Sequence, residues 1–241
     1  MHVFMRILAL SMPLQLVVPA VASADLGVPE FEAVYKVRVS VARGEMRLVF
    51  ERRDGALVYH SELEPTGFVS LFKRGVLAET SRFEYGGGQV RPLEYDLVDT
   101  ISENRDAHYV FDWAAGEVTG SYRGQPVETG LDGLTVDRLL LQVAIMSDLA
   151  HGREVEAYTV FDRAKAKHYS IEVGDAGTAE TPAGEFSVVE VSYTSDDGRK
   201  AIVLQCAPDL HYLPVRIEQR EDGEVKSRAE LVEYEFGSAA G

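Results

Sequence analysis

The stretch Leu134–His151 is the one segment of this sequence whose apolar residues recur at helical spacing instead of alternating. Thr135 can cap the helix, Asp137 lies in the first turn, where the helix dipole favours an anion, and Gly152 follows as a stop signal. Two opposite faces are apolar, one made of Val136, Leu139, Leu140, Val143 and Met146 and the other of Leu141, Ile145 and Leu149. Both faces of such a helix must be buried, so we expect a curved sheet to pack around a helix over Thr135–Ala150.

The remaining sequence consists of short alternating segments with turn residues between them. In Glu32–Arg43 the apolar and polar residues alternate, and Asp54-Gly55 between the next two segments is a strong hairpin signal. The other predicted strands are Glu45–Arg53, Ala56–Glu64, Leu77–Tyr85, Gln89–Leu97, Ala107–Asp112, Glu117–Tyr122, Glu154–Asp162, His168–Gly174, Thr178–Thr181, Phe186–Thr194, Lys200–Cys206, Val215–Arg220 and Lys226–Phe236. Thr129–Gly133 is expected to lead the chain into the helix.

Strands at a spacing of roughly 8–12 residues are typical of sandwiches and barrels. We therefore predict an all-β, mainly antiparallel fold, a curved open barrel or spiral β-roll around one principal α-helix. A two-sheet sandwich with the helix at one end is the alternative. Because no repeat or shift in composition divides the sequence, residues 25–241 are expected to form a single β-rich domain.

The N-terminus has the pattern of a cleavable signal peptide spanning residues 1–24. Arg6 precedes the mostly apolar run Ile7–Val18, and Ala22-Ser23-Ala24 fits a signal-peptidase site. We expect a mature chain that begins at Asp25 and is exported to the periplasm; a retained N-terminal anchor is the less favoured alternative. The Leu134–His151 stretch is shorter than the roughly 20 apolar residues that a membrane-spanning helix needs, so no transmembrane helix is expected in the mature chain.

The net charge and the cysteine content limit which partners and which covalent cross-links are expected. The formal net charge is −15, which disfavours binding to nucleic-acid phosphates, so no nucleic-acid partner is expected. Cys206 is the only cysteine, which excludes an intramolecular disulfide. Its apolar surroundings in the sequence predict a buried thiol with a structural role.

Six phrases occur together and in order: PEFEAVYKV, TGFVSLFKRGVLAETSRFEY, VFDWAAGEVTG, LTVDRLLLQVAIMSDL, AETPAGEFSVVEV and APDLHYLPVRIEQREDG. Together they resemble the domain-of-unknown-function 3108 family of exported bacterial proteins, over nearly all of the mature chain. One departure is Gln205, where the family has an aromatic residue. The resemblance implies a location in the cell envelope and a β-rich fold similar to that of periplasmic lipoprotein-carrier proteins, and it carries no active site.

No catalytic or metal-binding motif is present. The histidines of the expected mature chain show no spacing typical of paired metal ligands, which favours surface positions; they are His60, His108, His151, His168 and His211. There is no Gly-x-Ser-x-Gly sequence, and Asp196-Asp197-Gly198 lacks the further ligands of a calcium loop. We predict no catalytic residues, no cofactor and no metal, and therefore a non-catalytic protein. A glycan or peptide hydrolase with two carboxylates is the less favoured alternative.

The candidate ligand- or partner-binding residues lie after Gly67. They are Phe68, Val69, Leu71, Phe72, Lys73 and Arg74, an apolar run without alternation that ends in two positive charges. One interpretation is a hydrophobic lip that contacts an apolar or amphipathic envelope ligand, such as a lipid, or an envelope protein. The other is a short helix that plugs one end of the roll.

A structural scaffold for envelope integrity is the alternative function. It could act through an exposed sheet edge or through the ridge of Leu141, Ile145 and Leu149, which would then be exposed. Arg138 could pair with a strand carboxylate inside the curl, although a position along the helix edge is favoured. Pro214 is expected to limit pairing in an edge strand.

Overall fold

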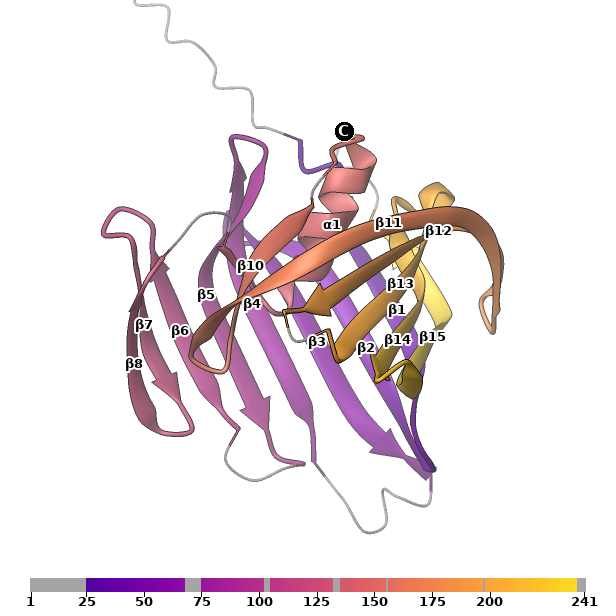
Figure 1. Ribbon diagram of the computed structural model, residues 1–241, viewed down its shortest axis with the longest axis horizontal. Coiled ribbons are helices and arrows are strands. Elements are labelled where there is room, and N and C mark those ends of the chain that lie inside the picture. The colour runs from indigo at the N-terminus through magenta and orange to yellow at the C-terminus, as the bar shows by residue number, and fades with distance from the viewer. Residues whose placement is uncertain are drawn as a thin grey trace, which may run out of the picture.

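The computed structural model describes residues 25–67, 75–101, 105–131, 135–154, 156–196 and 198–237. These residues form strands and two short helical segments (Figure 1). The strands are β1 (Phe31–Val39), β2 (Ala42–Arg53), β3 (Ala56–Thr66), β4 (Leu77–Gly86), β5 (Gln89–Asp99), β6 (Ala107–Asp112), β7 (Glu117–Tyr122), β8 (Gln125–Gly130), β9 (Thr135–Asp137), β10 (Ala157–Asp162), β11 (Lys165–Thr181), β12 (Gly184–Ser195), β13 (Lys200–Ala207), β14 (Leu213–Glu221) and β15 (Glu224–Phe236). The helix α1 spans Leu140–Ala150, and a 3-10 turn, η2, spans Pro208–Leu210.

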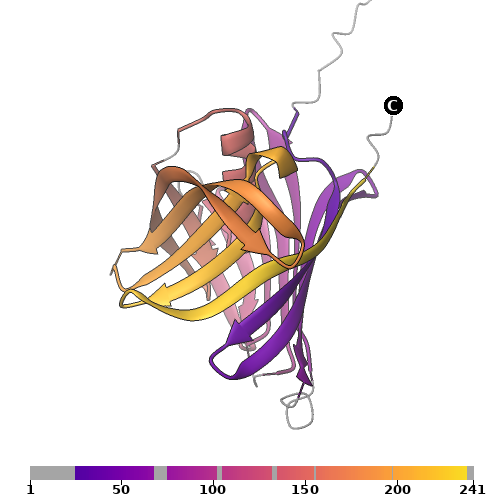
Figure 2. The ribbon, with the colours of Figure 1, turned by 90° about the vertical axis from the view of Figure 1, so that its right-hand side faces the viewer.

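All described strands belong to one sheet, whose order is β8-β7-β6-β5-β4-β3-β2-β1-β15-β14-β13-β12-β11-β10-β9. It consists of two meanders joined in the middle, where β1 pairs with β15. The pairing is antiparallel everywhere except between β9 and β10. Figures 1 and 2 show the sheet curling around α1 without closing. The predicted open roll around one helix is confirmed, and the sandwich alternative is wrong.

Local sequence chemistry explains the hairpins. Asp54 and Gly55 have φ of 51° and 79°, and Asp222 and Gly223 have φ of 51° and 81°. Positive φ at both central residues defines the type I′ turn, whose twist matches that of the flanking strands. Both hairpins therefore form where the Asp-Gly pairs predict them.

The helix begins later than predicted. Residues Thr135–Asp137 form strand β9, which pairs in parallel with β10, and α1 begins only at Leu140. Thr135 does not cap the helix. Instead, Oδ1 of Asp137 accepts hydrogen bonds from the backbone N–H groups of Leu139 and Leu140, each at 2.9 Å. The expected connection Thr129–Gly133 is likewise wrong in part, because strand β8 extends to Gly130.

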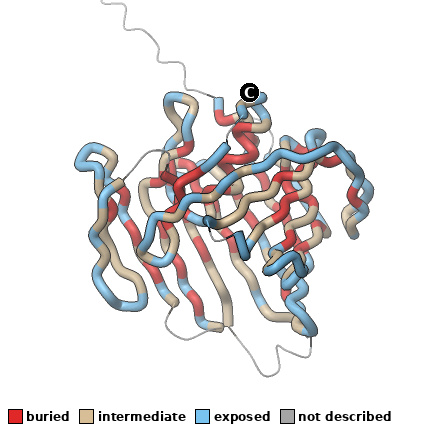
Figure 3. Tube along the Cα trace, in the orientation of Figure 1, coloured by how far each residue is buried: buried red, intermediate tan, exposed pale blue. Residues whose placement is uncertain are grey.

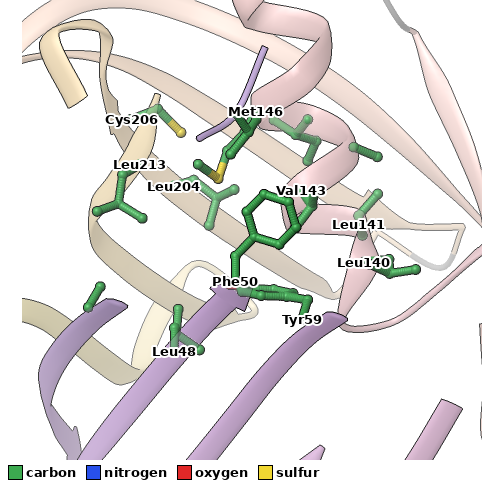
Figure 4. Close-up of a cluster of buried hydrophobic side chains, with 14 of the residues drawn as sticks. Leu48, Phe50, Tyr59, Leu140, Leu141, Val143, Met146, Leu204, Cys206 and Leu213 are labelled. Atoms are coloured by element: carbon green, nitrogen blue, oxygen red, sulfur yellow. The ribbon is translucent and has the colours of Figure 1, made fainter. Parts of the chain in front are cut away.

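Both apolar ridges of α1 are covered by the curled sheet. Figure 4 shows Phe50 of β2 facing Val143 and Met146, while Leu204 and Leu213 line the far wall. Leu141 and Ile145 are 1% and 3% exposed, and Leu149 packs against the same core. The helix-ridge version of the scaffold hypothesis is therefore wrong. The other version of that hypothesis, in which the protein acts through an exposed sheet edge, stays a prediction. Strand β8 is one such edge.

Three further expectations were decided by tertiary contacts. Strand β14 lies between β13 and β15, so the expected edge strand at Pro214 is wrong; its carbonyl accepts a hydrogen bond from Tyr35 Oη at 2.8 Å. Arg138 pairs with Glu79 and does not extend along the helix edge. Cys206 is fully buried as predicted, and burial raises the pKa of its thiol.

Candidate functional site

A large hollow lies at the end of the curl that holds α1 and both described ends of the chain. It has a volume of about 930 Å³, and we call it the terminal cavity. Its lining comes from the first described residues, from β2–β5 and from the last described residue: Asp25, Leu26, Val28, Pro29, Glu30, Phe50, Arg52, Asp54, Gly55, Ala56, Leu57, Phe83, Glu84, Tyr85, Leu93 and Gly237. The two ends of the chain are held together here by a 2.8 Å hydrogen bond from Gly237 N to Glu30 O.

The terminal cavity has an apolar floor and a charged rim. Strand alternation directs Phe50, Leu57 and Phe83 inward, where each is buried in the main core. Carboxylates and one guanidinium occupy the rim, from Asp25, Glu30, Arg52, Asp54 and Glu84. Such a hollow suits a molecule with an apolar body and a polar end, because the floor removes apolar surface from water and the rim stays solvated.

A second, polar hollow of about 280 Å³ lies at the opposite end, and we call it the arginine pocket. Its lining is Leu77, Tyr95, Leu97, Arg105, Ala107, Tyr109, Tyr122, Arg138, Asp162, Arg163 and Gln219. Each of its arginines already has a carboxylate partner: Arg138 pairs with Glu79 at 3.4 Å, Arg163 with Asp162 at 3.8 Å, and Arg105 with Asp99. An anion entering this pocket would have to compete with these carboxylates.

Buried polar side chains separate the two hollows. The Tyr95 hydroxyl donates to Glu79 Oε2 at 2.7 Å, and burial raises the pKa of Tyr95. Asp137 is fully buried, and desolvation raises the pKa of its carboxyl to about 7, although hydrogen bonds from Leu140, Ser81 and Leu139 act in the other direction. Its Oδ2 has no hydrogen-bond partner among the described residues. This group ties β4, β9 and α1 together, and its role is structural.

The candidate residues Phe68, Val69, Leu71, Phe72, Lys73 and Arg74 lie outside the described residues. Their flanks are placed: β3 ends at Thr66, and Val76 N donates to Thr100 Oγ1 at 2.8 Å. Figure 1 shows these flanks at the end of the sheet opposite α1. The arginine pocket lies at the same end, because its lining includes Leu77 and Leu97. The flanks of the segment that the sequence singled out therefore lie at one end of the roll, and the terminal cavity lies at the other.

Comparison with known families identifies the chain. Residues 30–230 match the family described as a protein of unknown function, DUF3108. The chain belongs to this family. The resemblance seen in the ordered phrases of the sequence is thus confirmed. No curated protein matches the sequence significantly.

Solved structures that align with this DUF3108 protein share little sequence with it. A β-barrel-like protein of the domain of unknown function DUF1849 from Brucella abortus aligns with a TM-score of 0.59 and 13% identity, over 88% of this chain and 99% of that one. The MucA/MucB complex of Pseudomonas aeruginosa gives 0.38 and 12%, over 88% of this chain and 53% of that one. The first likeness supports the open curved sheet; neither transfers a function.

Within the described residues, no helix has both the length and the apolar character needed to cross a bilayer.

Sequence reasoning missed two groups of residues. The terminal cavity is lined by strand ends and by both described ends of the chain. No local sequence pattern predicts that these segments meet. Glu94, Asp96 and His108 converge on the outer face of the sheet, although the spacing of the histidines gave no sign of it. The available signal was weak: two acids at i and i+2 on one predicted strand, and a polar-face histidine on the next.

Proposed function

We propose that this DUF3108 protein is exported and binds an apolar or amphipathic molecule of the cell envelope in the terminal cavity, without catalysing a reaction. The observation that supports this most directly is the cavity itself. At about 930 Å³ it lies within the range of known small-molecule sites, roughly 300–1,000 Å³, and its floor is made of core aromatic and aliphatic side chains.

The proposed export rests on the leader pattern and on the residues that follow it. A cut after Ala24 would leave Leu26 and Val28, each 7% exposed, inside the folded body. It would also leave Asp25 at the cavity rim. Processing at this position would thus keep every described residue that lines the cavity.

The test combines native mass spectrometry with a fluorescence assay. The protein is purified from the periplasm and weighed intact, and accompanying molecules are extracted and identified. Binding of the apolar dye N-phenyl-1-naphthylamine, and its displacement by palmitate and by lysophosphatidylethanolamine, is then measured. We expect dye binding that both competitors reverse.

Two substitutions on one strand separate cavity binding from general surface binding. Leu93→Asp places a charge in the cavity lining, whereas Val98→Asp places one at an exposed valine of the same strand, β5. We expect Leu93→Asp to abolish dye binding and Val98→Asp to leave it unchanged. Equal binding by the two folded variants would refute the terminal cavity as the site.

The same assay tests the hydrophobic segment that the sequence singled out. The double variant Phe68→Asp/Phe72→Asp adds charge to this segment, whose described flanks lie at the end of the sheet opposite the terminal cavity. Loss of binding in this variant, with Leu93→Asp unaffected, would move the ligand site to that end. We expect Leu93→Asp to lose binding and the double variant to retain it.

A further inference from the structure

Three side chains of metal-binding type meet on the outer face of the sheet. Glu94 and Asp96 lie two residues apart on β5 and so share a face, and the register places Asp96 directly opposite His108 of β6. Figure 1 shows these two strands side by side. His108 Nδ1 lies 2.8 Å from Asp96 Oδ1 and 4.0 Å from Glu94 Oε1. The three donor atoms lie within 4.8 Å of one another, the only such convergence among the described residues.

This geometry is close to that of a zinc site. Zinc binds histidine nitrogen and carboxylate oxygen at about 2.0–2.2 Å, which sets tetrahedral ligand atoms about 3.3 Å apart. The two measured separations, 2.8 and 4.0 Å, bracket that value. The side chains are 40–48% exposed, so small rotations about their torsions can bring all three donors onto one ion.

The local charge also favours a cation. Among the described residues, the guanidinium paired with this cluster is that of Arg82, whose Nε lies 3.9 Å from Glu94 Oε2. An imidazole ligand selects first-row transition metals, because magnesium and calcium prefer oxygen alone. We propose that Glu94, Asp96 and His108 bind one divalent transition-metal cation, for which zinc is the test ion, with water in the remaining position.

The strands hold the ligands at fixed positions. Asp96 is paired on one side with Thr80 of β4 and on the other with His108. The ladder between β5 and β6 has only four residue pairs, from Glu94–Val110 to Leu97–Ala107, and it carries β6, β7 and β8. A metal ion bridging the two strands would therefore stabilise a short junction of the sheet, and zinc should raise the unfolding temperature by mass action.

The experiment is a zinc titration of the chelator-treated protein by calorimetry, with ¹⁵N NMR of the histidine side chains. We expect saturation at one zinc per chain and a shift of the His108 ring signals. His108→Gln and Asp96→Asn should each weaken binding by more than about tenfold, because loss of a group that only orients a ligand already costs roughly 10–100-fold. Arg82→Gln should tighten binding, since a competing cation is removed. Magnesium should not displace the zinc.

His60→Gln is the matched control, because His60 lies on β3, two strands from β5, bonds to Thr80 Oγ1 at 2.8 Å and is not one of the three converging side chains. Zinc should raise the unfolding temperature of the wild type and of His60→Gln but not of His108→Gln, with folding of each variant checked by circular dichroism. If His108→Gln binds zinc as tightly as the wild type, the ion sits elsewhere and the proposal is wrong. It is equally wrong if the wild-type His108 signals do not respond to zinc.

Discussion

At the residue scale, Asp137 makes the stability of the fold depend on pH. Burial raises the pKa of this carboxyl from 3.8 to about 7, so the folded protein retains a proton that the unfolded chain releases. The stability contributed by this proton is fully present below about pH 4 and is lost as the pH rises through about 7. The orphaned Oδ2 fits a neutral carboxyl, since a buried unpaired charge costs more than a buried hydroxyl.

Replacement of Asp137 by Asn isolates this effect. The amide oxygen can still accept the hydrogen bonds from Leu139 and Leu140, but the side chain no longer titrates. Between pH 5 and pH 8 the wild type should lose about 3 kcal/mol of unfolding free energy relative to the variant, because one pKa unit corresponds to about 1.4 kcal/mol. Urea unfolding at several pH values measures it. Parallel pH curves would contradict the prediction, and Asp222→Asn in an exposed turn is the control.

At the element scale, one glycine permits the pairing of β6 with β7. Gly120 has φ of +147° and lies opposite Tyr109. A Cβ atom at this position would lie 1.9 Å from the carbonyl oxygen of His108, and an L-residue rarely adopts this conformation. The β6–β7 ladder therefore depends on the absence of a side chain at one position.

The prediction compares two alanine substitutions. Gly120→Ala should lower the free energy of unfolding by more than about 3 kcal/mol, because backbone strain and the clash with the His108 carbonyl add. Gly116→Ala should cost only about 1 kcal/mol, because Gly116 has positive φ but open space around it. Fluorescence of Trp113, whose Nε1 donates to Pro92 O at 2.7 Å, reports unfolding nearby. Equal losses in the two variants would show that the clash is relieved at little cost.

At the scale of the whole molecule, two buried clusters join the meanders. Figure 3 shows buried residues on strands at both sides of the curl and on α1, and mostly exposed residues along β11. The main core takes residues from β1–β5, from α1 and from β10–β15. In the second cluster, Phe161 of β10 meets Tyr109 of β6 edge-on, with ring centroids 4.8 Å apart. Neither meander therefore completes its core alone.

This shared packing predicts one cooperative unfolding transition. Trp113 fluorescence reports the β5–β7 region, and far-ultraviolet circular dichroism reports the sheet as a whole. Both should give the same urea midpoint, as expected for a two-state transition. A fluorescence midpoint clearly below the dichroism midpoint would instead show that β6–β8 unfold as a separate unit.

The sequence by itself determined the features that depend on neighbouring residues. Alternation in Ala107–Asp112 and Glu117–Tyr122 gave both strands with their observed bounds, and the Asp-Gly pairs placed two hairpins, because strand period and turn dihedral angles are local properties. The apolar residues next to Cys206 in the sequence likewise predicted its burial. The ordered phrases led to the correct family.

Only the tertiary structure decided features in which distant segments meet. Val136 became a strand residue because it pairs with Val160 of β10, which follows α1 in the chain, although its neighbours in sequence have a helical pattern. Arg138 meets Glu79 because the curl brings the residue after β9 to β4, and His108 meets Asp96 because the β5–β6 register places them opposite each other. No short stretch of sequence encodes either contact. The terminal cavity arises where the two described ends of the chain meet strands β2–β5. Such sites depend on the curl of the whole sheet, in which the first strand, β1, pairs with the last, β15.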